Sequence, residues 1–306
     1  MASTSTPPLL SRSALAFFVR EGWVIQRDVL DASQLAAARD VHERHLQESA
    51  EPPPAFSRDL CAEPALLDLL PRRCWQVAEQ LLGQGTLVEP SEEPAAPDGP
   101  RLSGGGVAGG HHLRAIVSRH KAESQDPALA RRPQHGCHVD AHPFSLGVLT
   151  YLHDVAPGAG AFSVWPRTHD RAFRCFPWQY SSREPSHAAL AGDGGNEGVV
   201  KELVAAALRD ISPVALHGRA GDVIYFHHRL LHAGGHNLTE ETRTAVFYDF
   251  VKTPQLFRRN AALAEQPSEN GDGPPPLDMW EDWSCETRAA AAAAAAVHAA
   301  PPMPKL

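Results

Sequence analysis

The pattern of apolar and polar positions changes partway along the chain. Before residue 83, apolar residues recur at helical spacing and a short β-type run lies at residues 23–25, which predicts helices over residues 11–20, 33–47, 65–70 and 74–82. After residue 110, short β-type runs are bounded by Gly, Pro, Asp or Asn. They predict strands over residues 112–117, 144–152, 161–165, 214–217, 223–226 and 244–250, with one helix over 199–208. Many short strands with irregular connections favour a mainly β sandwich or barrel with supporting helices.

Three stretches differ from this pattern. Residues 83–110 are rich in Pro and Gly and predict a long loop. Residues 187–209 begin as a Gly-rich loop and continue into a helix, which makes them a candidate lid. The Pro- and Ala-rich composition after residue 265 is typical of a low-complexity tail. We therefore expect a flexible N-terminus (1–10), one domain (11–265) with loop insertions at about 83–110 and 181–200, and a C-terminal tail (266–306).

Composition excludes several classes of function. The chain carries 28 Lys and Arg against 36 Asp and Glu, with no dense basic run, so nucleic acid is not an expected partner. No apolar run approaches the ~20 residues that a membrane-spanning helix needs. Five scattered cysteines without a Cys-x-x-Cys pair indicate free thiols in a reducing compartment rather than disulfides or a cysteine-based zinc site.

Seventeen histidines carry the candidate chemistry, and their spacing distinguishes among them. His138 and Asp140 lie two residues apart, so a strand would place the imidazole and the carboxylate on one face. His232 follows the predicted strand 223–226, and Arg243 precedes the strand 244–250. Two imidazoles and one carboxylate with open coordination positions form the facial triad of non-haem Fe(II) oxygenases. A nearby guanidinium suits one carboxylate of a dicarboxylic cosubstrate, because its planar fork matches that group.

These residues and their flanking motifs resemble the phytanoyl-CoA dioxygenase family of iron(II)- and 2-oxoglutarate-dependent oxygenases. The resemblance covers roughly residues 11–253 and rests on Glu21-Gly22-Trp23-Val24-Ile25, His138-Val139-Asp140-Ala141-His142, Leu149-Thr150-Tyr151-Leu152-His153-Asp154-Val155, the segment 160–169, Gly221-Asp222, His232 and Arg243. It implies a double-stranded β-helix (jelly roll, cupin-like) in which His138, Asp140 and His232 hold Fe(II). It also implies that Arg243 binds the distal carboxylate of 2-oxoglutarate, and that O2 is consumed while a C–H bond is hydroxylated and succinate and CO2 are released.

Two positions depart from the family pattern. Gly234 stands where many members carry a small hydroxyl residue that helps to hold 2-oxoglutarate, and Leu152-His153-Asp154 replaces a common Leu-Asn-Asp. Neither position is a metal ligand, so the departures concern only the remaining cosubstrate contacts. Some relatives of the wider superfamily place a small residue and chloride where this chain has Asp140. The resemblance therefore favours hydroxylation over halogenation.

Other interpretations stay open at the level of sequence. His228 and His232 would form a zinc-binding pair of a hydrolase if they lay on one helix, and His135 with His138 would form another partial zinc site. A jelly-roll protein that binds a metal or metabolite without turnover is a further alternative. The candidates for contact with a small organic or acyl substrate are His142, His169 and Arg167. The sequence specifies neither the substrate nor the oligomeric state.

The final tripeptide, Pro304-Lys305-Leu306, is similar to the Ser-Lys-Leu peroxisomal signal except at its first residue. We expect a cytoplasmic location, with the peroxisome as the alternative.

Overall fold

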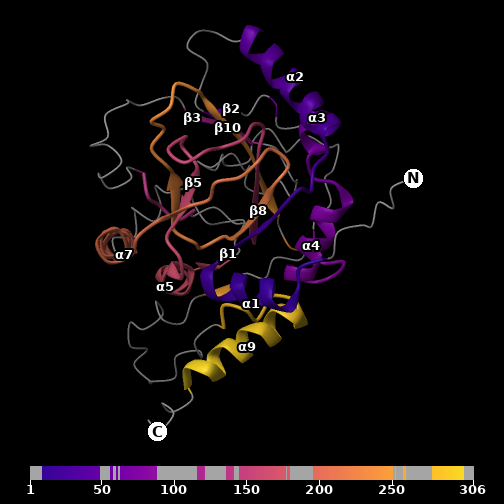
Figure 1. Ribbon diagram of the computed structural model, residues 1–306. Coiled ribbons are helices and arrows are strands. Elements are labelled where there is room, and N and C mark those ends of the chain that lie inside the picture. The colour runs from indigo at the N-terminus through magenta and orange to yellow at the C-terminus, as the bar shows by residue number, and fades with distance from the viewer. Residues whose placement is uncertain are drawn as a thin grey trace, which may run out of the picture.

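Antiparallel sheets flanked by helices form the centre of the molecule (Figure 1). The computed structural model describes residues 9–48, 56–57, 60, 63–87, 116–120, 136–140, 145–176, 178–179, 196–250, 252, 258–259 and 278–299, and the structural statements below refer to these. Most of the predicted loop 83–110, the first part of the candidate lid and the C-terminal tripeptide lie outside the described residues.

The largest sheet has six strands and pairs segments that are far apart in the chain. Its order is β1 (Trp23–Gln26), β8 (Val223–His227), β4 (Leu146–Tyr151), β10 (Arg243–Phe250), β3 (Ile116–His120) and β2 (Phe56–Ser57). A three-stranded sheet has the order β7 (Val214–Ala215), β5 (Phe162–Val164) and β9 (His232–Gly234). A two-stranded sheet consists of β6 (Trp178–Gln179) and β11 (Arg258–Arg259).

Both faces of the six-stranded sheet are covered, and strand parity decides which residues lie on each face. On β8, Val223 and Tyr225 pack into a cluster shared with the helices, whereas Ile224 and Phe226 pack into a second cluster shared with β5. Gly147 on β4 lies opposite Phe226, and a Cβ at this position would come within 2.1 Å of the Phe226 ring. Glycine is therefore required for Phe226 to cross its neighbouring strand.

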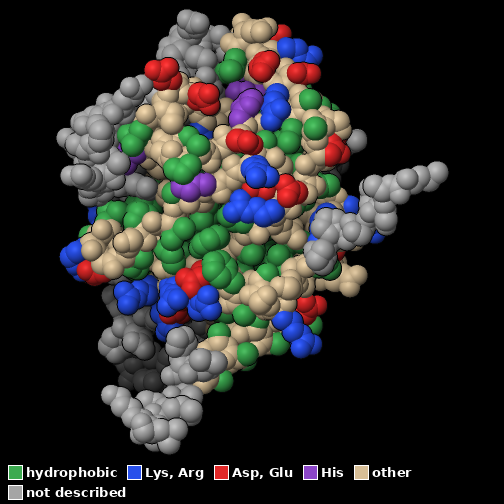
Figure 2. Space-filling view, viewed as in Figure 1, with side chains coloured by type: hydrophobic (Ala, Val, Ile, Leu, Met, Phe, Trp, Pro, Cys, Tyr) green, Lys and Arg blue, Asp and Glu red, His purple; other side chains and the backbone are tan. Residues whose placement is uncertain are grey.

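Helices surround the sheets on two sides (Figure 1). One group comprises α1 (Arg12–Glu21), α2 (Ala32–Glu48), α3 (Pro64–Leu67) and α4 (Arg72–Leu82), and the other comprises α5 (Thr168–Cys175) and α7 (Asn196–Asp210). Ser11 caps the start of α1, since its hydroxyl accepts from the Ala14 amide, and Gly22, with φ 86°, caps the end. On the face shown in Figure 2, Lys and Arg side chains are interspersed with Asp and Glu.

The C-terminal region differs from the predicted tail. Helix α9 (Cys285–Ala299) lies beside α1, and Met279, Trp280 and Trp283 just before it are buried in the same cluster as α1 and α4 (Figure 1). The Leu81 carbonyl accepts from the Ser284 amide and the Thr287 hydroxyl at 3.0 and 2.9 Å. Alanine has the highest helix propensity, and the two tryptophans supply buried surface that the alanine run lacks.

Most predicted strands correspond to observed ones, but the description "mainly β" needs correction. The runs at 144–152, 161–165, 214–217, 223–226 and 244–250 correspond to β4, β5, β7, β8 and β10, and the predicted helix 199–208 corresponds to α7. Among the described residues, however, helices contain more residues than strands. Neither α5 nor α9 was among the predicted helices. Within these residues, no helix is both long and apolar enough to cross a membrane.

Candidate metal centre

His138 and His232 face each other across two adjacent backbone segments. The amide of each residue donates to the carbonyl of the other, at 3.0 and 2.9 Å. This is a hydrogen-bonded antiparallel pair, so both side chains project from the same face. Their ring centroids are 4.4 Å apart. His138 belongs to an isolated bridge rather than to a strand, but its pairing with β9 brings together two histidines far apart in the sequence.

Asp140 completes a compact set of donor atoms. Its Oδ1 lies 3.6 Å from His138 Nε2, and its Oδ2 lies 3.4 Å from His232 Nε2. The three ligand atoms all lie within 4.8 Å of one another, which no other group of His, Cys, Asp or Glu does among the described residues. An ion with bonds of about 2.0–2.2 Å requires donors roughly 3 Å apart. The arrangement therefore fits a single ion after small side-chain adjustments.

The tautomers of both histidines are also suited to metal binding. His138 Nδ1 lies 2.5 Å from the Gly136 carbonyl, and His232 Nδ1 lies 2.9 Å from the Leu230 carbonyl. Because a carbonyl oxygen only accepts, each Nδ1 carries a proton, and in the neutral imidazole this leaves the lone pair on Nε2, as metal binding requires. Both lone pairs belong to the nitrogen atoms nearest Asp140. The His138 side chain is 46% exposed and that of His232 is 7% exposed, so the site opens on the His138 side.

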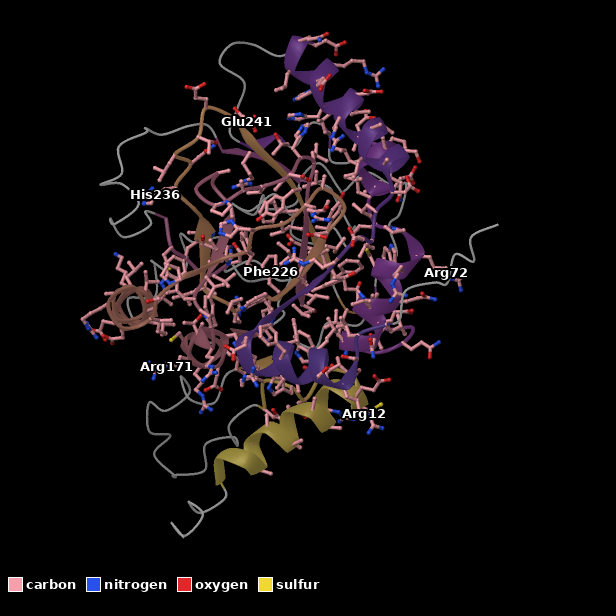
Figure 3. All side chains as sticks on the ribbon, in the orientation of Figure 1. Arg12, Arg72, Arg171, Phe226, His236 and Glu241 are labelled. Atoms are coloured by element: carbon pink, nitrogen blue, oxygen red, sulfur yellow. The ribbon has the colours of Figure 1, made fainter. Side chains whose placement is uncertain are left out.

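Aromatic rings enclose the inner side of this site. Phe162 and Phe226 lie 5.1 and 5.4 Å from the His232 ring, centroid to centroid, and Phe247 lies 5.7 Å from Phe162. Figure 3 shows Phe226 in the middle of the molecule, among the strands. These three phenylalanine side chains have no hydrogen-bonding group, so they exclude water from the buried side of His232.

Arg243 is buried at the start of β10, and its Nε donates to the Gly160 carbonyl at 2.9 Å. Burial lowers the pKa of its guanidinium, while the neighbouring Tyr151 acts in the opposite direction. The segment 160–162 lies between Arg243 and the triad. Its Gly160 carbonyl accepts from Arg243, and its Phe162 ring lies against the His232 ring.

A cavity of about 340 Å³ lies beside Arg243. Its lining consists of His153, Asp154, Val155, Ala159, Glu241, Thr242, Arg243 and Thr244. The three triad residues do not line it, so the cavity alone does not connect Arg243 to the triad. The donor atoms, rather than this cavity, define the candidate site.

The remaining predicted candidates lie elsewhere or outside the described residues. The Nε2 of buried His169 lies 3.0 Å from the Val19 carbonyl, and Arg167 pairs with Glu21 at 2.8 Å. These contacts place both residues at the junction of α1 and α5. His135 and His142 are outside the described residues. His228 lies in a turn and His232 in β9, so the helical zinc pair is not formed.

One residue beside the site was missed by the sequence analysis. Arg229 is fully buried, and its Nη1 donates to the Asp140 carbonyl at 2.6 Å. The available signal was a single charged residue between a buried strand and Leu230-Leu231. A buried arginine in such a run requires polar partners inside the fold.

A two-imidazole, one-carboxylate donor set in an antiparallel β fold is typical of the non-haem Fe(II) oxygenases as a class. More narrowly, the chain belongs to the phytanoyl-CoA dioxygenase family, because the family model described as phytanoyl-CoA dioxygenase (PhyH) matches residues 18–245. No curated protein matches the chain significantly.

The solved structures of EctD show the same fold at low sequence identity, and a carbocyclase is similar at a lower TM-score. The structure of EctD from S. alaskensis with bound Fe is 17% identical, with a TM-score of 0.51 over 84% of this chain and 83% of that chain. The same protein with 2-oxoglutarate and 5-hydroxyectoine gives 16% identity and a TM-score of 0.50, over 84% and 82%. The non-heme alpha ketoglutarate dependent carbocyclase SnoK from nogalamycin biosynthesis gives 16% and 0.49, over 90% and 97%.

Proposed function

We propose that this chain is an Fe(II)- and 2-oxoglutarate-dependent dioxygenase that hydroxylates a C–H bond of a small organic or acyl substrate and releases succinate and CO2. The observation that carries the proposal is the donor set of His138, Asp140 and His232. Both imidazoles present Nε2 toward the carboxylate, and backbone carbonyls hold both Nδ1 protons. In this proposal, the six-stranded and three-stranded sheets are the two halves of a jelly roll.

The protein and the metal have separate tasks in this mechanism. Fe(II), when bound, supplies the activation of O2 that is coupled to oxidative decarboxylation of 2-oxoglutarate. His138, Asp140 and His232 would hold the ion, and a three-residue donor set would leave positions for the cosubstrates. Phe162 and Phe226 exclude water from the buried side. Substrate approaches from the exposed His138 side.

Arg243 is the proposed partner of the distal carboxylate of 2-oxoglutarate. Its guanidinium is held by the Gly160 carbonyl and lies in a buried environment, where a charge-assisted hydrogen bond is stronger than in water. A cosubstrate carboxylate would also offset the cost of burying this cation. Gly234 on β9 has no side-chain hydroxyl that could help to bind 2-oxoglutarate. Arg243 on β10 would therefore make the main polar contact with this cosubstrate.

The proposal is tested by adding Fe(II) and 2-oxoglutarate to the apoprotein without oxygen. We expect the metal-to-ligand charge-transfer absorption band of a chelated 2-oxoglutarate complex near pH 7, and succinate release once O2 and a substrate pool are supplied. A protein that binds Fe(II) but gives no such band would contradict the assignment. Binding without succinate release from any pool would support the non-catalytic alternative. Zinc in protein purified anaerobically would support the hydrolase.

Arg243→Ala separates the two parts of the site. We expect the variant to keep its Fe(II) affinity but to need at least about tenfold more 2-oxoglutarate for the same absorption, because a charged hydrogen-bonding partner contributes about 1.5–3 kcal/mol. The matched control is Arg174→Ala, whose side chain is 63% exposed on α5. Equal 2-oxoglutarate affinity in the wild type and in Arg243→Ala would exclude Arg243 as the carboxylate partner.

A further inference from the structure

Arg229 is a fully buried cation beside the candidate metal centre, in the turn between β8 and β9. Its Nη1 donates to the backbone carbonyl of Asp140 at 2.6 Å. The centre of its guanidinium lies 3.9 Å from the centroid of the Phe176 ring. Phe176 is the residue directly after α5. The guanidinium therefore joins the Asp140 backbone to an aromatic face of a neighbouring element.

The main chain of the same turn is held at several points. The Arg229 amide donates to His227 Nδ1 at 3.0 Å, and the Leu231 amide donates to the Thr168 hydroxyl at 3.0 Å. The Trp165 amide donates to the Leu231 carbonyl at 2.9 Å. Because the backbone on both sides of Arg229 is fixed, its side chain starts from a defined position.

This turn contacts two of the three candidate ligands. Leu230 accepts from His232 Nδ1 at 2.9 Å, and Arg229 holds the carbonyl of Asp140. Asp140 lies in the short segment 136–140. The His138–His232 pair joins this segment to β9. A hydrogen bond to the Asp140 carbonyl restrains the backbone dihedrals that aim the carboxylate at both Nε2 atoms.

We propose that Arg229 is a positioning residue that fixes Asp140 for metal binding through its backbone carbonyl. This inference rests on the proposed function of the His138, Asp140 and His232 site. Burying a guanidinium is costly, and a hydrophobic residue of similar volume often gives equal or greater stability. A role in positioning a ligand gives a reason for an arginine here that packing alone does not give. Lysine would not substitute for it, because lysine lacks the planar fork that bonds a carbonyl while stacking on a ring.

The test compares metal affinity with fold stability in Arg229→Lys. Co(II) is titrated into the apoprotein, with calorimetry for the affinity and visible d–d bands for the ligand geometry, while thermal unfolding of the apoprotein is recorded separately. We expect the Co(II) affinity to fall by about 10–100-fold, as for other changes that disturb the orientation of a metal ligand. The band shape should also change. Arg174→Lys, at an exposed position on α5, is the matched control and should match the wild type.

A second variant keeps the inference testable if Arg229→Lys does not fold. Phe176→Leu retains the arginine but removes the ring beneath it, so we expect a smaller loss of Co(II) affinity with an altered band. Unchanged affinity and band shape in the folded variants would overturn the positioning role. If the wild type itself binds no Co(II), the proposed function fails together with this inference. If the wild type binds and the variants bind equally well, only this inference fails.

Discussion

Two groups of histidines lie at the two ends of the β8–β9 turn, and they differ in their neighbouring groups and in their exposure to solvent. The triad combines two imidazoles with the Asp140 carboxylate and opens to solvent at His138. The second group, here the aromatic histidine cluster, consists of His169, His227, His228, Trp280 and Trp283. His227 stacks on His228 at 4.4 Å and on Trp283 at 5.1 Å between ring centroids. All five residues are buried.

The electrostatic states of the two groups follow from these surroundings. Burial lowers the pKa of His169 to about 4 and lowers that of His227 well below its usual value. In the part of the chain that the structure describes, His227 Nε2 and His169 Nδ1 are buried without a hydrogen-bond partner. Such rings stay neutral and pack the segment before α9 onto the sheet. Histidine content alone therefore does not predict a metal site, and the candidate site differs in having a carboxylate and an accessible face.

The largest expected effect is loss of metal binding in Asp140→Ala. Removing the carboxylate takes away the charged ligand, so the loss of Co(II) affinity should exceed the ~10–100-fold cost of disturbing a residue that only orients a ligand. The thermal midpoint of the apoprotein should stay near that of the wild type, because Asp140 is only partly buried. Asp170→Ala, an exposed carboxylate on α5, serves as the control in the same titration. Retained affinity in Asp140→Ala would remove the distinction between the two groups.

Trp283→Ala should have the opposite profile. Truncating this buried ring deletes the stacking on His227 and the contact with Phe18, and large-to-small changes of this kind cost about 3–5 kcal/mol. Urea unfolding measures this loss, and Co(II) titration of the folded fraction should give the wild-type affinity. Glu281→Ala, an exposed position in the same segment, is the control. A Trp283→Ala protein of normal stability would show that the C-terminal segment contributes little to the fold.

The sequence predicted one of these groups and missed the other for physical reasons. His138 and Asp140 are separated by one residue, so a local rule about strand faces applied to them. His232 was selected through the order of motifs in the resembling family. The aromatic histidine cluster joins residues from α5, β8 and the C-terminal segment, and no local spacing links them. Arg229 was missed because its partner is a backbone carbonyl, which leaves no signature in the sequence.

Acid should weaken the fold through the aromatic histidine cluster. The pKa of His169 is about 4 in the folded chain and about 6.5 unfolded, so the unfolded state binds more protons between these values. The stabilisation is fully present above pH 6.5 and is lost as pH falls toward 4, by about 3 kcal/mol. Burial opposes the charged form of His169, whereas the Val19 carbonyl, Asp170 and Glu21 favour it. Urea unfolding from pH 7 to pH 4 measures the change.

His169→Gln is the matched variant for this pH dependence. A glutamine N–H can still reach the Val19 carbonyl but does not titrate, so the fall in the free energy of unfolding between pH 6.5 and 4 should be shallower than in the wild type. Parallel curves for the two proteins would assign the acid sensitivity to other groups.

The smallest expected effect is the coupling between the two groups. Trp283 packs in the cluster of α1 and α4, whereas Val139, next to Asp140, packs with Trp165 and Leu231, so the two side chains belong to different parts of the core. Changes at separate sites usually add to within about 0.3–0.5 kcal/mol. In a double-mutant cycle of Asp140→Ala and Trp283→Ala, the free energies of unfolding of the apoprotein should therefore be additive to that extent. The turn between the groups makes this a demanding test, because Arg229 contacts both His227 and Asp140. A coupling above 1 kcal/mol would mean that the turn transmits strain between the two groups.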